Sequence, residues 1–105
     1  MNKTKELEIC VNNQDGKKFH IIKDKFGYIR LSGAGVDIDF TIDTYHEENG
    51  KDKFMIGLIE WVMLTHNFTI MDIITVLSRL KYNFNADEEV QKMDGLIKTI
   101  NKSVR

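Results

Sequence analysis

The chain has 105 residues, no proline, one cysteine and a formal net charge of −1. Its apolar fraction of 42% and charged fraction of 30% are typical of a globular protein, and the length suits one domain. The single cysteine excludes a scaffold framed by intramolecular disulfides. The start of the chain lacks the apolar stretch of a signal peptide, and the longest nearly apolar run, 54–64, is too short to cross a bilayer. We therefore expect a cytoplasmic protein with no membrane partner.

The first half of the chain predicts β-strands. Leu7, Ile9 and Val11 alternate with polar residues, and a second strand over 17–23 follows a turn at Asp15-Gly16. A two-residue loop would place the apolar residues of these strands on opposite faces. A loop of three or five residues pairs Val11 with Phe19 and Ile9 with Ile21, so that they share one face. We predict the odd loop, with Gly16 in the left-handed conformation and Ile22 facing outward.

Two further strands are predicted, over 28–32 and 36–45. The segment 32–35, SGAG, separates them as a plain turn, because it connects two strands and does not open a helix as a phosphate-binding loop does. The strand over 36–45 alternates apolar residues with Asp37, Asp39, Thr41 and Asp43. Short sequential connections predict that residues 1–46 form an antiparallel meander with one dry face and one wet face.

The second half predicts helices. After a loop over 46–51, the helix over 52–66 is apolar on nearly every side, which predicts burial across the sheet with the later helices outside it. Thr69 and Asp72 resemble a capping box before a helix over 70–82, and Asn85 or Asp87 can cap a third helix. The predicted fold is α+β: a four-stranded antiparallel β-meander (1–46), then three α-helices (52–103) packed on one face of the sheet.

Charge is unevenly distributed along the chain. Residues 37–52 carry six acids and one lysine, a net of −5, whereas residues 1–36 carry a net of +3. The spacing in the acidic strand matches the ligand positions of a calcium loop, but Ile42 occupies the position that must be glycine, and the strand alternation is uninterrupted. The acidic residues are Asp37, Asp39, Asp43, Glu47 and Glu48.

The leading hypothesis is a small, non-enzymatic protein that binds another protein through this acidic strand. Lysine outnumbers arginine 12 to 3, a usage that often accompanies AT-rich coding in bacteria and phages. One concrete version is therefore a bacterial or phage-borne inhibitor that presents carboxylates to a host nucleic-acid-binding or defence protein, in the host cytoplasm if the source is a phage.

The alternative is single-stranded nucleic-acid binding by the second and third strands, where lysines alternate with aromatic side chains. An isoelectric point near 6.3 weighs against it, and lysines on edge strands also prevent aggregation. The residues of this alternative are Lys17, Lys18, Lys23, Lys25, Tyr28 and Arg30.

The sequence predicts no metal site, no cofactor and no catalytic group, so an enzyme is the less favoured class. The three histidines fall in different predicted elements, and the sequence does not place a base beside Cys10. A third alternative is a small enzyme whose site forms on dimerisation. Met55, Trp61 and Met63 are then candidates for an oligomer interface, although core packing is favoured for them. The sequence leaves monomer and homodimer open.

Overall fold

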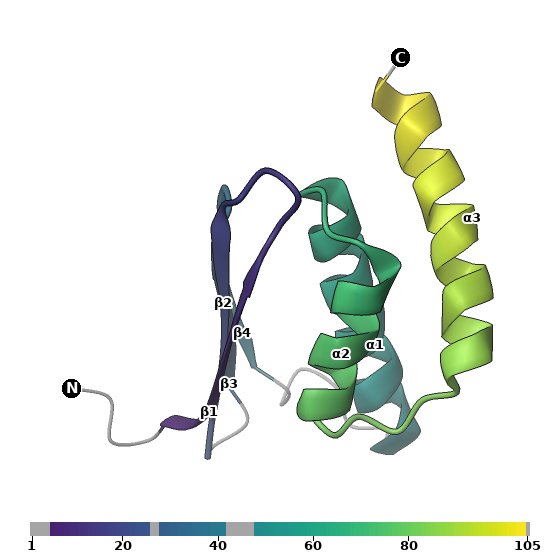
Figure 1. The fold of residues 1–105 in the computed structure, drawn as a ribbon. Helices are drawn as coiled ribbons and strands as arrows, with labels where there is room; N and C mark the ends of the chain where they lie inside the picture. The colour runs from purple at the N-terminus through teal and green to yellow at the C-terminus, as the bar shows by residue number, and fades with distance from the viewer. Residues whose placement is uncertain (1–4, 26–27, 42–47, 105) are drawn as a thin grey trace.

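The structure, a computed structural model, describes residues 5–25, 28–41 and 48–104. Four strands, β1 (Lys5–Asn12), β2 (Lys18–Asp24), β3 (Tyr28–Gly33) and β4 (Val36–Thr41), form one antiparallel sheet in the order β1-β2-β3-β4. Three helices follow: α1 (Glu48–Thr65), α2 (Ile70–Arg79) and α3 (Ala86–Val104). All three lie on the same side of the sheet (Figure 1). The predicted α+β class, a meander followed by three helices, is confirmed.

The first hairpin has the predicted register. Val11 is paired with Phe19 and Ile9 with Ile21, so the loop between Asn12 and Lys18 has five residues. Gly16 adopts a φ of 78°, the left-handed conformation that the odd loop requires. Apart from Ile22, which faces outward as predicted, the apolar side chains of β1 and β2 therefore point together toward the helices.

The glycine-rich segment between β3 and β4 is a tight hairpin turn, as predicted. Gly33 is paired with Val36, which leaves Ala34 and Gly35 as a two-residue loop. Both loop residues have positive φ, 54° and 90°, which is the signature of a type I′ turn. This turn closes β3 onto β4 and places the acidic strand at the edge of the sheet.

The helices form two layers. α1 and α2 pack against each other next to the sheet, and α3 lies against them on the far side (Figure 1). The prediction that both later helices lie outside α1 is thus correct for α3 and wrong for α2. In α2 the buried side chains Ile73, Val76 and Leu77 recur at helical spacing, so one face of this short helix joins the core directly.

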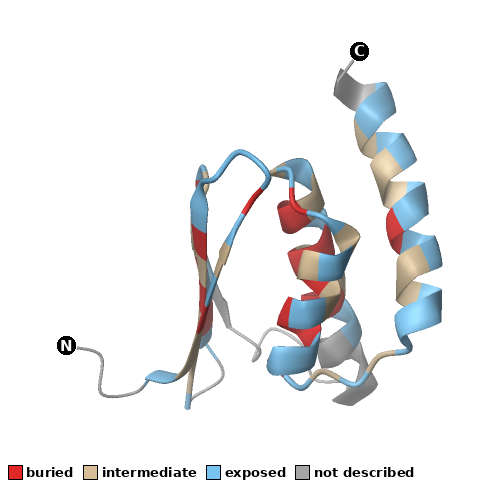
Figure 2. Ribbon diagram, viewed as in Figure 1, coloured by how far each residue is buried: buried red, intermediate tan, exposed pale blue. Residues whose placement is uncertain are grey.

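The core lies between the sheet and the first helical layer (Figure 2). Phe19 of β2 packs against Phe68, with ring centroids 5.3 Å apart. Met93 is fully buried on α3, and Val90, Leu96, Ile97 and Ile100 of the same helix are half-buried. Residues with no more than 2% exposure come from every layer and include Ile9, Ile21, Ile29, Leu31, Met55, Ile59, Met63, Ile73 and Leu77.

Three helix ends show how local chemistry sets the boundaries. α1 begins at Glu48, inside the predicted loop 46–51, because weak helix formers are tolerated in a first turn whose N–H groups have no intrahelical partner. The capping box of Thr69 and Asp72 is confirmed. α2 ends three residues before the predicted Tyr82, since Lys81 takes a φ of 62°.

Asn85 caps α3, where the sequence left Asn85 and Asp87 open. Its Oδ1 accepts hydrogen bonds from the N–H groups of Asp87 at 3.0 Å and Glu88 at 3.3 Å. The predicted fourth strand continued to residue 45, and residues 42–45 lie outside the described part of the chain. None of the described helices has the length and hydropathy to span a membrane.

Candidate functional site

The sheet face opposite the helices carries most of the polar residues of the strands. Alternation sends every second side chain there, and the register aligns these side chains in rows across the strands. Cys10, His20, Ser32 and Asp37 form one row. The neighbouring row contains Glu8, Ile22, Arg30 and Asp39. We refer to this side of the sheet as the outer face.

The acidic end of the outer face is built around one arginine. Arg30 Nη2 lies 3.2 Å from Asp37 Oδ1, and Arg30 Nε lies 3.7 Å from Asp39 Oδ1. The side chains of Asp37 and Asp39 remain 75% and 67% exposed. Ion pairs at such exposure contribute little to stability. Because both carboxylates are exposed, they remain accessible to a partner. Of the other predicted acids, Asp43 and Glu47 lie outside the described residues, and Glu48 begins α1.

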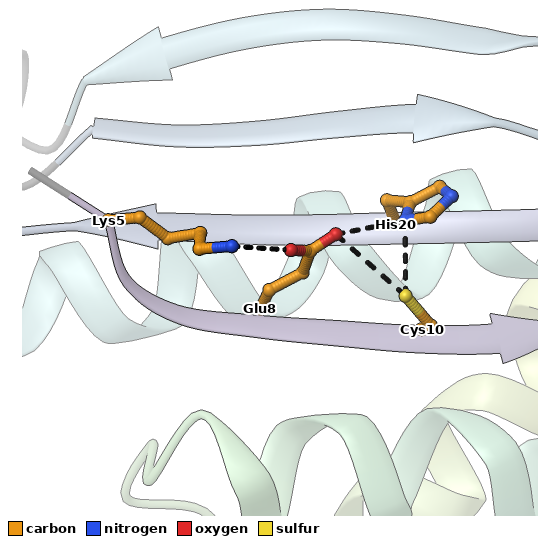
Figure 3. Close-up of polar contacts among 4 residues, drawn as sticks. All are labelled: Lys5, Glu8, Cys10 and His20. Atoms are coloured by element: carbon orange, nitrogen blue, oxygen red, sulfur yellow. Dashed lines mark hydrogen bonds and ion pairs between the residues drawn. The ribbon is translucent and has the colours of Figure 1, made fainter. Parts of the chain in front are cut away.

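At the other end of the outer face, three side chains from β1 and β2 meet (Figure 3). Cys10 Sγ lies 3.1 Å from His20 Nδ1, and the same nitrogen lies 3.1 Å from Glu8 Oε2. Sγ and Oε2 are 3.9 Å apart. Strand geometry explains this Glu8–Cys10–His20 cluster: residues two apart share a face, and Cys10 stands directly opposite His20.

Lys5 completes the cluster from the start of β1. Its Nζ lies 2.8 Å from Glu8 Oε1, the carboxylate oxygen that does not face His20. This hydrogen bond from Lys5, with a second from His20, lowers the pKa of Glu8 below its ordinary value. The same contact raises the pKa of Lys5. Glu8 is therefore a carboxylate at neutral pH, and Lys5 fixes which oxygen it offers to the cluster.

The arrangement does not form a nucleophilic relay. In a cysteine–histidine–carboxylate relay the nucleophile and the carboxylate bond to different nitrogens of the imidazole. Here the thiol and the carboxylate both face Nδ1 (Figure 3). Sulfur, nitrogen and oxygen donors instead converge on one point, and all three lie within 4.8 Å of one another. Such convergence is what a metal ion requires.

The sequence contained the signal for this cluster. The predicted register, with Val11 opposite Phe19, already places Cys10 opposite His20. Taken one at a time, Cys10 has no histidine base near it in the sequence and His20 has no histidine or cysteine at a metal-ligand spacing. Spacing along the chain cannot reveal a site that depends on pairing between strands.

The residues of the nucleic-acid alternative do not share one face. Lys23 is paired with Ile29 and Leu7, both at inward positions. Lys17 lies in the first hairpin loop, and Lys25 lies beyond the far end of β2. The outer face carries Lys18, Tyr28 and Arg30, and the guanidinium of Arg30 is paired with the acids of β4.

The residues predicted for an oligomer interface are divided between core and surface. Met55 and Met63 are buried within the single chain, at 1% and 0% exposure. Trp61 is 42% exposed, and Phe54 is 40% exposed seven residues earlier on the same side of α1. Of the predicted set, Trp61 alone lies on the surface.

A groove of about 620 Å³ separates α1 from the start of α3, and a buried acid lies next to it. Glu60 of α1 has no exposed side-chain surface, and Lys92 Nζ lies 3.2 Å from its Oε1. Glu89 and Lys92 line the groove. Burial, together with the neighbouring Glu89 carboxyl, raises the pKa of Glu60 to about 8, although Lys92 acts in the opposite direction. The sequence signal is the single acid within the otherwise apolar run 54–64.

Comparisons of the chain with protein-family models, with curated proteins and with solved structures return no match. The function must therefore be inferred from the chemistry of the described surface. Two clusters on the outer face, Asp37–Arg30–Asp39 and Glu8–Cys10–His20, bring together its charged and metal-ligating side chains.

Proposed function

We propose that the protein is a non-enzymatic interaction protein that binds a protein partner through the outer face of its sheet. The observation that carries this proposal is the exposed pair of carboxylates, Asp37 and Asp39, on the strand at the edge of the sheet. Arg30 contacts both carboxylates and leaves both of them exposed. A surface of this kind complements basic side chains on a partner and sets the orientation of docking.

The partner suited to this face presents lysine or arginine, as nucleic-acid-binding and defence proteins do. In that finer version the protein is an inhibitor of bacterial or phage origin that occupies such a surface. The near-neutral total charge supports docking on one specific partner, because a molecule of net charge −1 has no strong long-range attraction for every basic protein.

Charge reversal tests the proposal. The double variant Asp37→Lys/Asp39→Lys should lose capture of its partner from a host lysate, since it repels a basic surface and leaves Arg30 unpaired. The control Asp15→Lys/Asp94→Lys changes the net charge by the same amount at exposed positions on the first hairpin loop and α3. It should retain capture.

Equal capture by the two double variants and the wild type, measured by mass spectrometry of the bound fraction, would contradict the proposal. Retention on a heparin column in about 50 mM salt, where phosphate contacts are strongest, would favour the nucleic-acid alternative instead.

A further inference from the structure

We propose that the Glu8–Cys10–His20 cluster binds one Zn²⁺ ion through three protein ligands and leaves a fourth coordination position open to water. The ligand atoms are Glu8 Oε2, Cys10 Sγ and His20 Nδ1. This inference goes beyond the proposed function and does not depend on it, because the acids of β4 take no part in the site.

The spacing of the three donor atoms fits a tetrahedral ion. With Zn–S near 2.3 Å and Zn–N or Zn–O near 2.0–2.1 Å, tetrahedral geometry separates the donors by roughly 3.3–3.6 Å. The separations in the structure are 3.1 Å for Sγ to Nδ1, 3.1 Å for Nδ1 to Oε2 and 3.9 Å for Sγ to Oε2. Small side-chain rotations bring these distances to the values that zinc requires.

The donor set selects the class of ion. A thiolate and an imidazole prefer zinc and other late first-row ions, whereas Mg²⁺ and Ca²⁺ require shells made of oxygen. One thiolate and one carboxylate supply two negative charges, which balance a divalent cation. Binding displaces the thiol proton of Cys10 to solvent and forms the zinc–sulfur bond in its place, so no oxidation or reduction is involved.

The backbone holds the ligands in place before the ion arrives. Cys10 and His20 are opposed in a paired register, and Glu8 follows the same face of β1 two residues earlier. Lys5 orients the Glu8 carboxylate: its Nζ lies 2.8 Å from Oε1, and this contact leaves Oε2 facing the other two donor atoms. Partners of this kind orient metal-binding side chains and commonly change the affinity by 10–100-fold. Lys5 is thus a positioning residue of the proposed site.

The place of the cluster at the edge of the sheet explains why the fourth coordination position of the ion would be open. β1 is an edge strand, and the side chains of Glu8 and His20 are 31% and 33% exposed. Zinc held by three protein ligands carries water or an exchangeable ligand as the fourth. Here that position would face solvent, where a further ligand from outside the chain can reach it.

Cobalt serves as the probe, because it takes the ligands of zinc and absorbs light. The full chain, reduced and freed of metal with a chelator, is titrated with Co²⁺. We expect one equivalent per chain, a near-ultraviolet band from thiolate-to-cobalt charge transfer, and loss of that band when Zn²⁺ is added. Mg²⁺ and Ca²⁺ should not displace the cobalt.

Single variants assign the ligands. Cys10→Ser should lose the charge-transfer band, His20→Gln and Glu8→Gln should weaken Zn²⁺ binding at least tenfold, and Lys5→Gln should weaken it about tenfold without removing the band. The matched controls are His66→Gln and Asp94→Asn, which lie outside the cluster and should bind as the wild type does. Circular dichroism in the absence of metal verifies the fold of each variant, and half-exposed positions tolerate such changes.

Several results would overturn the proposal. One is the absence of a charge-transfer band in the wild type. Another is Zn²⁺ binding of equal strength in the wild type and Cys10→Ser, which would indicate adventitious binding to carboxylates. A stoichiometry of one cobalt per two chains would replace the single-chain site with an ion shared between copies. Unchanged partner capture by the charge-reversed protein would contradict the proposed function but would leave the metal titration unaffected, so the two proposals can fail separately.

Discussion

Gly33 is the residue at which the sheet has no room for a side chain. It lies at the end of β3 with a φ of 94°, and a Cβ built there would approach the carbonyl oxygen of Lys18 to 2.3 Å. That oxygen belongs to the backbone of β2, so the clash is relieved only by moving a strand. Gly16 has a similar φ of 78°, but its Cβ would meet nothing within 4 Å.

These two glycines form a matched pair for experiment. Gly33→Ala should lower the free energy of unfolding by about 2–4 kcal/mol, because left-handed strain and a backbone clash act together. Gly16→Ala should lower it by about 1–2 kcal/mol from the strain alone. Urea denaturation of both variants and the wild type measures the difference. Equal losses would show that β2 and β3 separate without cost.

The outer face shows at residue scale what a sequence can and cannot predict. The alternation of β1 and the odd hairpin loop are local features, and they predict the pairing of Cys10 with His20. The direction in which each side chain turns within that pair is not local. It depends on Lys5 and Glu8, whose contacts appear only once the strands are built.

At the scale of elements, the first hairpin is fastened to the end of α1 by a single buried amide. Asn13 Nδ2 donates to the carbonyl oxygen of His66 at 2.9 Å, and Asn13 Oδ1 accepts from the N–H groups of Asp15 and Lys17. Gln14 adds two more hydrogen bonds to Asn67. The asparagine thus shapes the five-residue loop and ties the sheet to the helical layer.

Asn13→Ala should lower the free energy of unfolding by about 2–4 kcal/mol, since it leaves the carbonyl oxygen of His66 and two backbone N–H groups without this partner. The control Asn12→Ala removes an exposed amide one residue earlier and should cost less than about 0.5 kcal/mol. Thermal denaturation followed by circular dichroism compares the two. A loss for Asn13→Ala as small as that of the control would contradict the role of the loop.

The order of the helical layers was less predictable than the elements themselves. α2 and α3 both carry an apolar stripe, and the stripe alone does not say which helix meets the sheet. α2 follows α1 after a short turn, and its Ile73, Val76 and Leu77 are wholly buried in the first layer. α3 reaches the core with Met93 and otherwise covers α1 and α2. Competition between helices for the sheet is a non-local effect that periodicity does not encode.

At the scale of the whole molecule, a net charge of −1 conceals three separate electrostatic sites within the described part of the chain. The acids of β4 surround Arg30 on the outer face, and Glu8 is held between Lys5 and His20. The third site is Glu60, which lies in the helical layers beside Glu89 and Lys92. The acidic strand β4 was predicted from the sequence. The sequence also predicted the strand register on which the Glu8 cluster depends. For Glu60 it showed only a single acid within an apolar run.

Glu60 links the packing of α3 to pH. Its pKa in the folded protein is about 8, whereas the ordinary value is 4.5. Between these two values the folded chain holds a proton that the unfolded chain has released, so the free energy of unfolding falls as the pH rises. Below about 4.5 both states are protonated, and above about 8 both are ionised, so Glu60 adds no slope outside this window.

The wild type should therefore lose about 2–4 kcal/mol of stability between pH 5 and pH 9 through Glu60. Glu60→Gln should lack that loss and exceed the wild type in stability at pH 9, because a neutral amide replaces a buried charge. Lys92→Met should steepen the loss, since it removes the cation 3.2 Å from the carboxylate. Urea denaturation at pH 5, 7 and 9 gives the three profiles. Parallel profiles for the wild type and Glu60→Gln would show that the carboxylate is already solvated in the folded state and that α3 does not seal it from water.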